Sequence, residues 1–204
     1  MTTTHLFVEL LVIGLGALIW LGLLVAGLFG YEVGPLRGTW LSLETIFPLL
    51  TIAYLVGILV DRAADFVFSF WDGRLLAREF GGSRRDKTRY YELRRTLISE
   101  APELWKHLEY GRSRLRICRG WFVNAVLIAS VLTAACAFGR PLAGIHGFHL
   151  FLGDLLLLVL AMGCAACWYE LNRKEYRKIN RQAPWIEQRE RQASRTLRRL
   201  RRRL

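Results

Sequence analysis

A set of polar residues falls at one end of the long apolar stretches of this chain, where their side chains could act together on ions. The set comprises Glu9, Asp61, Arg62, Asp65 and Asn124. Asp61 and Asp65 are four residues apart, so they share one face of a helix. Ionisable side chains within apolar stretches are costly, and they therefore indicate function by default. The set could line the inner mouth of a pore, or it could form a salt-bridge network in which Arg62 or Arg119 neutralises the acids.

Further polar residues lie toward the opposite ends of the same stretches. Glu44 and Asp154 fall at similar depth, where they could form an acidic vestibule for cations or simply reach toward water. Thr51 and Tyr54 lie between the two polar layers on the second stretch and could line a pathway. Pro48 could kink that stretch and free a backbone carbonyl. The sequence contains no selectivity-filter motif. These polar residues therefore indicate where an ion pathway could run, and they do not identify the ion.

The cysteines suggest a second kind of function, in which thiols carry out redox chemistry or bind a metal. The four cysteines are Cys118, Cys136, Cys164 and Cys167. Cys164 and Cys167 have the spacing of a redox or metal pair, but their apolar surroundings disfavour the reactive thiolate. The four histidines are too scattered to complete a zinc site, and the sequence has no phosphate-binding glycine-rich loop or nucleophile elbow. We therefore expect no enzyme activity, no cofactor and no metal.

The stretches that position these residues are almost free of charge, although the whole chain carries a formal charge of +12. They cover residues 6–29, about 43–62, about 120–138 and about 148–169. Each is close to the roughly 20 residues that a helix needs to cross a ~30 Å hydrocarbon core. Soluble helices mix charge into one face, whereas these stretches are apolar all round. The sequence therefore predicts an all-α polytopic membrane protein with four transmembrane helices.

The basic residues predict the orientation. Of 29 lysines and arginines, only Arg37 and Arg140 lie in the two short connections, whereas Arg62 and the segment 72–119 contribute 14 and the tail contributes 13. Basic segments stay in the cytoplasm, so we expect both termini there, in a multi-pass protein of the cell inner membrane. The organisation is then a hairpin at 1–71, a basic helical segment at 72–118, a second hairpin at 119–170 and a basic tail at 171–204.

The helices should continue beyond the bilayer and pack as a bundle rather than as loose basic loops. The pattern has few breakers, with Ser99 as a candidate cap of a new helix and Pro184 as the first breaker after the last stretch. Leucines recur at helical spacing in the central segment, at Leu93, Leu97, Leu104 and Leu108.

Small residues recur every four positions within the stretches, a spacing that lets helices approach closely. The positions are Gly22, Ala26 and Gly30, then Ala125 and Ala129, and finally Ala161 and Ala165. They could pack helices within one chain or between chains. Since four short spans bury little surface alone, we expect a homo-oligomer.

Three functions follow from this pattern, and a membrane enzyme with cysteine chemistry ranks last of them. The first is an oligomeric channel or pore-forming effector that is gated through its cytoplasmic helices. The alternative is a non-conducting membrane anchor or regulatory subunit that docks a cytoplasmic protein. Residues 195–204 could form an amphipathic helix on anionic lipid or a disordered basic tail. We do not expect nucleic-acid binding, because the orientation rule already explains the arginines.

Overall fold

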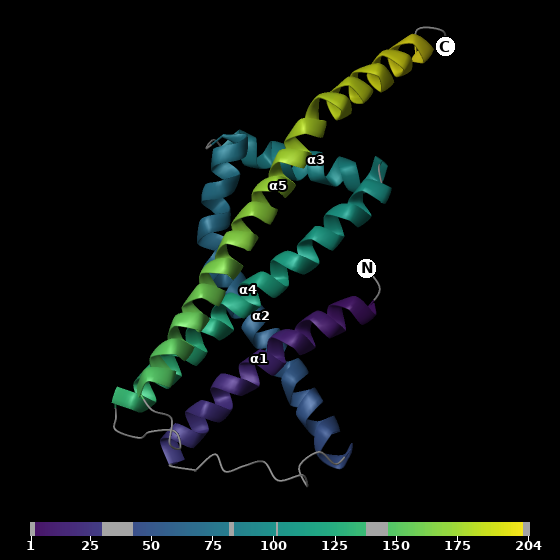
Figure 1. The fold of residues 1–204 in the computed structure, drawn as a ribbon. Coiled ribbons are helices and arrows are strands. Elements are labelled where there is room, and N and C mark those ends of the chain that lie inside the picture. Colours follow the sequence, from purple (N-terminus) through teal and green to yellow (C-terminus); the bar gives the residue numbers. More distant parts are fainter. Residues whose placement is uncertain (1–2, 30–42, 82–83, 101, 138–146, 202–204) are drawn as a thin grey trace. The chain divides into compact units, whose positions relative to one another are not determined.

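The computed structural model describes residues 3–29, 43–81, 84–100, 102–137 and 147–201. This part of the chain forms five helices and no strand, so the predicted all-α class is confirmed. The helices are α1 (Thr3–Phe29), α2 (Leu43–Phe80), α3 (Arg84–Glu100), α4 (Pro102–Ala137) and α5 (Gly147–Arg201), as Figure 1 shows.

All the helices except α3 contain a segment long and apolar enough to cross a membrane. These segments are Leu6–Phe29, Glu44–Phe80, Gly111–Ala137 and Leu150–Arg181. Between 6% and 33% of each apolar window is buried inside the chain, so most of its side chains face outward. Outward-facing apolar side chains are typical of helices that have lipid as their solvent. The chain therefore has the architecture of a multi-pass membrane protein.

Two local expectations differ from the structure. Ser99 does not cap a new helix, because α3 extends to Glu100 and the Ser99 hydroxyl donates backward to the carbonyl oxygen of Thr96 at 3.0 Å. Pro184 does not end α5, which continues to Arg201. A proline inside a helix removes one backbone hydrogen bond, and the remaining bonds of this long helix maintain it.

The helices belong to two compact units. Unit 1 comprises Met1–Phe68 and Arg112–Tyr169, and unit 2 comprises Ser69–Gly111 and Glu170–Leu204. Unit 1 holds α1 with the first part of α2, the last part of α4 and the first part of α5. Unit 2 holds α3 with the remaining parts of α2, α4 and α5.

Within unit 1, α1 and α2 cross at two glycines (Figure 1). A Cβ atom on Gly14 would lie 1.7 Å from the carbonyl oxygen of Ala53, and one on Gly57 would lie 2.0 Å from that of Leu10. No side chain fits at either position, so the backbones themselves are in contact. Close backbone approach is the main source of helix association in lipid, where the hydrophobic effect is lost.

Unit 2 has an apolar core of its own. The buried face of α3 carries Tyr90, Leu93 and Leu97. The ring of Phe80, at the end of α2, lies 5.2 Å from that of Tyr90. Gly81 follows at φ 97°, and its amide donates to the carbonyl oxygen of Ala77, which is how a glycine ends a helix. Leu93 and Leu97 thus lie on one apolar face as the sequence indicates, whereas the side chains of Leu104 and Leu108 lie outside the described residues.

Candidate functional site

Three of the predicted acids of unit 1, Glu9, Asp61 and Asp65, belong to one polar network that joins α1, α2 and α4. Its members are Glu9, Asp61, Asp65, Ser113, Arg116 and Arg119. At the α1 end, Glu9 Oε2 lies 2.8 Å from Arg116 Nη1, and the Ser113 hydroxyl donates to Glu9 Oε1. Glu9 is only 4% exposed, so these partners from α4 replace the water that its carboxylate would otherwise need.

Asp61 occupies the centre of the network. Its Oδ1 atom lies 3.7 Å from Arg116 Nε and 3.9 Å from Arg119 Nη2, and it accepts no hydrogen bond from the described residues. Arg119 also pairs directly with Asp65. The arginines that pair with Asp61 and Asp65 therefore both belong to α4. The side chain of Arg62, next to Asp61 in the sequence, is exposed.

The spacing of residues on α4 explains this geometry. Ser113, Arg116 and Arg119 are three residues apart, so they lie along one side of the helix. That side faces α1 and α2, where two guanidinium groups meet three carboxylates. Removing one partner of a buried pair leaves an uncompensated charge, so the network holds the three helices in one register. Sequence reasoning missed Arg116 and Ser113, because it counted them within a basic segment outside the membrane.

Asn124 lies apart from the acids and binds α1 alone among the described helices. Its Nδ2 donates to the carbonyl oxygen of Ile13 at 2.8 Å, and its Oδ1 accepts from Trp20 Nε1 at 3.2 Å. A Cβ atom on Gly16 would lie 2.6 Å from Asn124 Nδ2, so this glycine provides the space for the amide. Asn124 is fully buried, and its role in the structure is to hold α4 against α1.

The predicted residues near the other end of the apolar segments form their described hydrogen bonds and ring contacts with partners outside their own group. Asp154 Oδ2 accepts a hydrogen bond from Thr133 at 3.0 Å, and Glu44 is exposed on α2. Thr51 donates to the carbonyl oxygen of Phe47 in its own helix. Tyr54 is half-buried, and its ring packs against that of Phe7, with ring centroids 4.9 Å apart. The structure thus gives Asp154 a threonine partner and leaves the predicted vestibule as a prediction.

Most of the predicted small residues pack helices of a single chain. Ala26, Ala125, Ala129 and Ala161 are buried, and Ala165 is half-buried. Gly22 is exposed, and a Cβ atom there would meet nothing within 4 Å. Gly30 lies outside the described residues. The homo-oligomer remains a prediction.

The cysteines are all free thiols. Cys118 and Cys164 are half-buried, and Cys136 and Cys167 are exposed. In the described part of the chain, histidine, cysteine and acidic side chains do not gather into a group of three that could hold a metal ion.

Unit 2 contains a second set of polar contacts, between α2 and α5. Asp72 Oδ1 accepts hydrogen bonds from the Tyr176 hydroxyl, at 2.7 Å, and from the Asn172 amide. Glu79 pairs with Arg173 Nε at 3.1 Å and with Arg177 Nε at 3.2 Å. Both acids on α2 are therefore satisfied by α5. The seven-residue spacing of Asp72 and Glu79 indicates that both acids lie on one side of α2, and it is the sequence signal for this contact.

The opposite side of α3 is exposed. Tyr91, Arg95 and Ile98 recur at helical spacing on it, and we name them the α3 outer face. Tyr91 is 58% exposed and Ile98 is 44% exposed. Exposed apolar side chains beside an arginine are typical of protein-binding surfaces.

A scan against protein-family models found no match, and searches of the curated proteins and of the solved structures found none either.

Proposed function

We propose that this chain is an inner-membrane protein whose four spans form a non-conducting anchor and whose unit 2 docks a cytoplasmic protein. The observation that carries the proposal is the α3 outer face. Tyrosine and arginine are enriched among the residues that dominate binding energy at protein interfaces. Tyr91 and Ile98 flank Arg95 on a helix that has no apolar segment of its own, so these side chains face water until a partner covers them.

The polar network of unit 1 favours an anchor over a conducting pore. An ion that passed beside Glu9 or Asp61 would have to displace Arg116, which binds both acids. Displacing Arg116 would leave the buried carboxylate of Glu9 without its counterion, and an uncompensated buried charge is strongly destabilising. Acids that are satisfied inside one chain support a structural role for the network.

The charge distribution supports a cytoplasmic place for unit 2. Its helices carry most of the chain's basic residues, and basic segments remain on the cytoplasmic side. In this orientation the α3 outer face lies in the cytoplasm, where a cytoplasmic protein can reach it.

A photo-crosslinking experiment tests the docking role. In cells, a benzoylphenylalanine replaces Tyr91. The matched control carries it at Phe47, which is 66% exposed near the start of α2. We expect a discrete protein adduct at position 91 that is missing at position 47. The captured protein, once purified, should bind the whole chain, and Tyr91→Ala/Ile98→Ala should weaken that binding at least tenfold. Adducts with lipid alone, or with a second copy of the chain, would reject the docking role.

The oligomeric channel gated through unit 2 remains the second candidate. Glu44 and Thr51 favour it, because both are exposed on α2 and are seven residues apart on one helix face. Such a polar face would be covered if copies of the chain assembled around a shared pathway. Planar-bilayer recording of the purified protein tests it. A pathway along this face predicts a conductance that Glu44→Gln lowers and Asp61→Asn leaves unchanged, and silence under every gating condition rejects the channel.

A further inference from the structure

The α3 outer face has a spacing that a second helix can match. Tyr91 and Ile98 are seven residues apart, so their side chains lie two turns apart, about 10 Å along the axis of α3. Arg95 lies between them on the same side of the helix. A partner helix with two apolar side chains two turns apart can therefore cover Tyr91 and Ile98, and a side chain from the turn between them then meets Arg95.

The guanidinium group of Arg95 is available to such a partner. Arg95 is exposed, and among the residues that the structure describes its side chain has no ion-pair or hydrogen-bond partner. The exposed Glu92, one turn earlier, does not pair with it. The hydroxyls of Thr96 and Ser99 donate to carbonyl oxygens of α3 itself. Arginine binds carboxylates through two parallel hydrogen bonds, so Arg95 favours an aspartate or glutamate as its partner.

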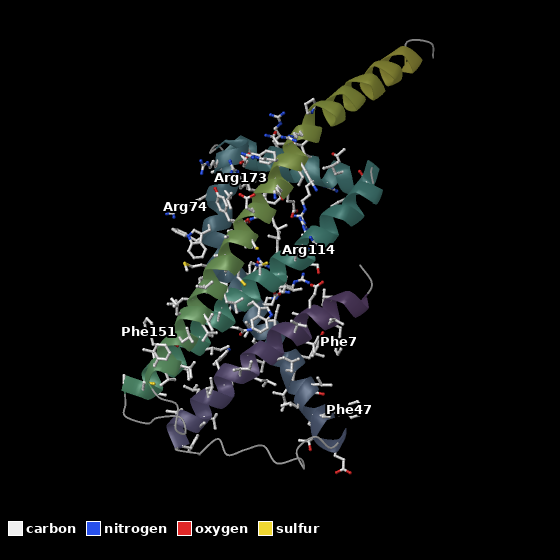
Figure 2. All side chains as sticks on the ribbon, viewed as in Figure 1. Phe7, Phe47, Arg74, Arg114, Phe151 and Arg173 are labelled. Carbon is white, nitrogen blue, oxygen red and sulfur yellow. The ribbon has the colours of Figure 1, made fainter. Side chains whose placement is uncertain are left out.

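The charge of unit 2 favours an acidic partner as well. The residues of this unit include 22 lysines and arginines against 11 aspartates and glutamates, so unit 2 carries a formal charge of +11 out of the chain's +12. Figure 2 shows two of these basic side chains, Arg74 on α2 and Arg173 on α5. A charge of this size attracts acidic molecules, speeds their encounter with the unit and disfavours basic partners.

An acidic protein fits the α3 outer face better than a lipid or a nucleic acid does. A helix that lies on a membrane inserts a broad apolar face, and the broad apolar face of α3, with Tyr90, Leu93 and Leu97, is already buried. A nucleic acid offers phosphates to Arg95, but its charged backbone offers no apolar surface to Ile98. A protein helix supplies a carboxylate and apolar side chains together, at positions one and two turns apart.

We infer that the α3 outer face binds an acidic amphipathic helix of the docked protein. A carboxylate of that helix pairs with Arg95, and two of its apolar side chains pack on Tyr91 and Ile98. The inference rests on the proposed docking role and names the chemistry of the partner that this role requires.

Binding of designed helical peptides to the detergent-purified full chain tests the partner chemistry. The first peptide presents two leucines seven residues apart with glutamates between them. The second replaces each glutamate with lysine, and the third keeps the acidic composition but scatters the leucines. Fluorescence anisotropy should show binding of the first peptide, with the other two weaker by about tenfold or more. Raising the salt over the range of about 0.05–0.5 M should weaken the binding, because salt screens the charges.

Variants of the chain separate the α3 outer face from general charge. Arg95→Glu should weaken binding of the first peptide by about tenfold or more. Arg181→Glu makes the same change of charge at an exposed position on α5 and should weaken it by less than about threefold. Arg95→Lys keeps the charge and should retain part of the binding, which shows that the loss is not misfolding. Equal losses in the two glutamate variants, or equal binding of the acidic and basic peptides, would overturn the inference.

Photo-crosslinking from position 91 keeps this inference separate from the docking role. A protein adduct that forms as well with Arg95→Glu as without it would leave the docking role in place and overturn the acidic partner. If no adduct forms, the docking role itself is rejected. Displacement of the first peptide by a single-stranded oligonucleotide or by phosphatidylglycerol vesicles, each dependent on Arg95, would assign the face to nucleic acid or to lipid and overturn the inference.

Discussion

The side-chain amide of Asn124 in α4 donates to the main-chain carbonyl oxygen of Ile13 in α1, over a distance of 2.8 Å. Asn124 also accepts from Trp20 Nε1 about two turns further along α1, so one buried side chain holds two points of the same helix. In lipid no water can replace these bonds, and the contact therefore fixes the register of α4 against α1.

Replacing Asn124 with alanine should destabilise the bundle. Interhelical hydrogen bonds in membranes are worth about 0.6–2 kcal/mol, so losing both bonds should lower the free energy of unfolding by about 1–3 kcal/mol. Unfolding in mixed micelles with increasing dodecyl sulfate measures this. Ser130→Ala is the control, because that exposed hydroxyl donates only within its own helix, to Val126. Equal stability of the two variants would show that the Asn124 contact is not structural.

The crossing of α1 and α2 predicts a destabilising effect of Gly57→Ala. An alanine methyl there would lie 2.0 Å from the Leu10 carbonyl oxygen, so the helices must separate. We expect a loss of about 1–3 kcal/mol or more, which is the usual cost of overpacking. Gly22→Ala is the control, because it adds the same methyl group at a position where a Cβ atom would meet nothing within 4 Å. The same micelle titration should leave Gly22→Ala unchanged, and a stable Gly57→Ala would mean that the two backbones are not in contact.

The sequence predicts the helices well because each apolar stretch carries very few charges and is apolar on all sides. It also predicts the buried face of α3, since Leu93 and Leu97 recur on a helix with a polar opposite side. The α1–α2 crossing is different. On a helix that is apolar all round, small residues satisfy four-residue spacing on several faces. Spacing alone therefore selected Gly22, whereas the structure uses Gly14.

The polar network shows the same limit. Glu9 and Asp61 stand out because acids are rare in apolar stretches. Arg116 does not stand out, because it is one of several arginines in a basic segment. Which arginine reaches the acids depends on the rotation of α4 about its axis, and the packing of Asn124 and Gly120 against α1 sets that rotation. Such long-range packing cannot be inferred from the local sequence.

The pair of Glu9 and Arg116 should be strongly coupled. Each single change, Glu9→Gln or Arg116→Gln, leaves a partly buried charge without its counterion and should cost about 1–3 kcal/mol. The double variant removes both charges and should cost less than the sum of the two single changes. Unfolding free energies of all four proteins form a double-mutant cycle, with coupling of at least about 0.5 kcal/mol expected. Additive effects would show that the ion pair does not form.

Tyr176→Phe tests the packing of α2 against α5 in unit 2. The change removes the hydroxyl that donates to Asp72 at 2.7 Å and keeps the ring edge-to-face with that of Tyr90. Hydrogen bonds to charged groups are worth about 1.5–3 kcal/mol, so thermal unfolding in detergent should occur at a lower temperature. Tyr91→Phe alters an exposed ring on α3 and should leave the transition in place. An unchanged transition in Tyr176→Phe would contradict the contact.

The central claim is that α2 crosses the inner membrane and leaves unit 2 in the cytoplasm. Single cysteines at Glu44 and at Thr88, introduced after the four native cysteines are replaced, test it with a membrane-impermeant maleimide. The account predicts that intact spheroplasts label Glu44→Cys at once and label Thr88→Cys only after lysis. Labelling of Thr88→Cys in intact spheroplasts, or recovery of the protein in buffer without detergent, would contradict it.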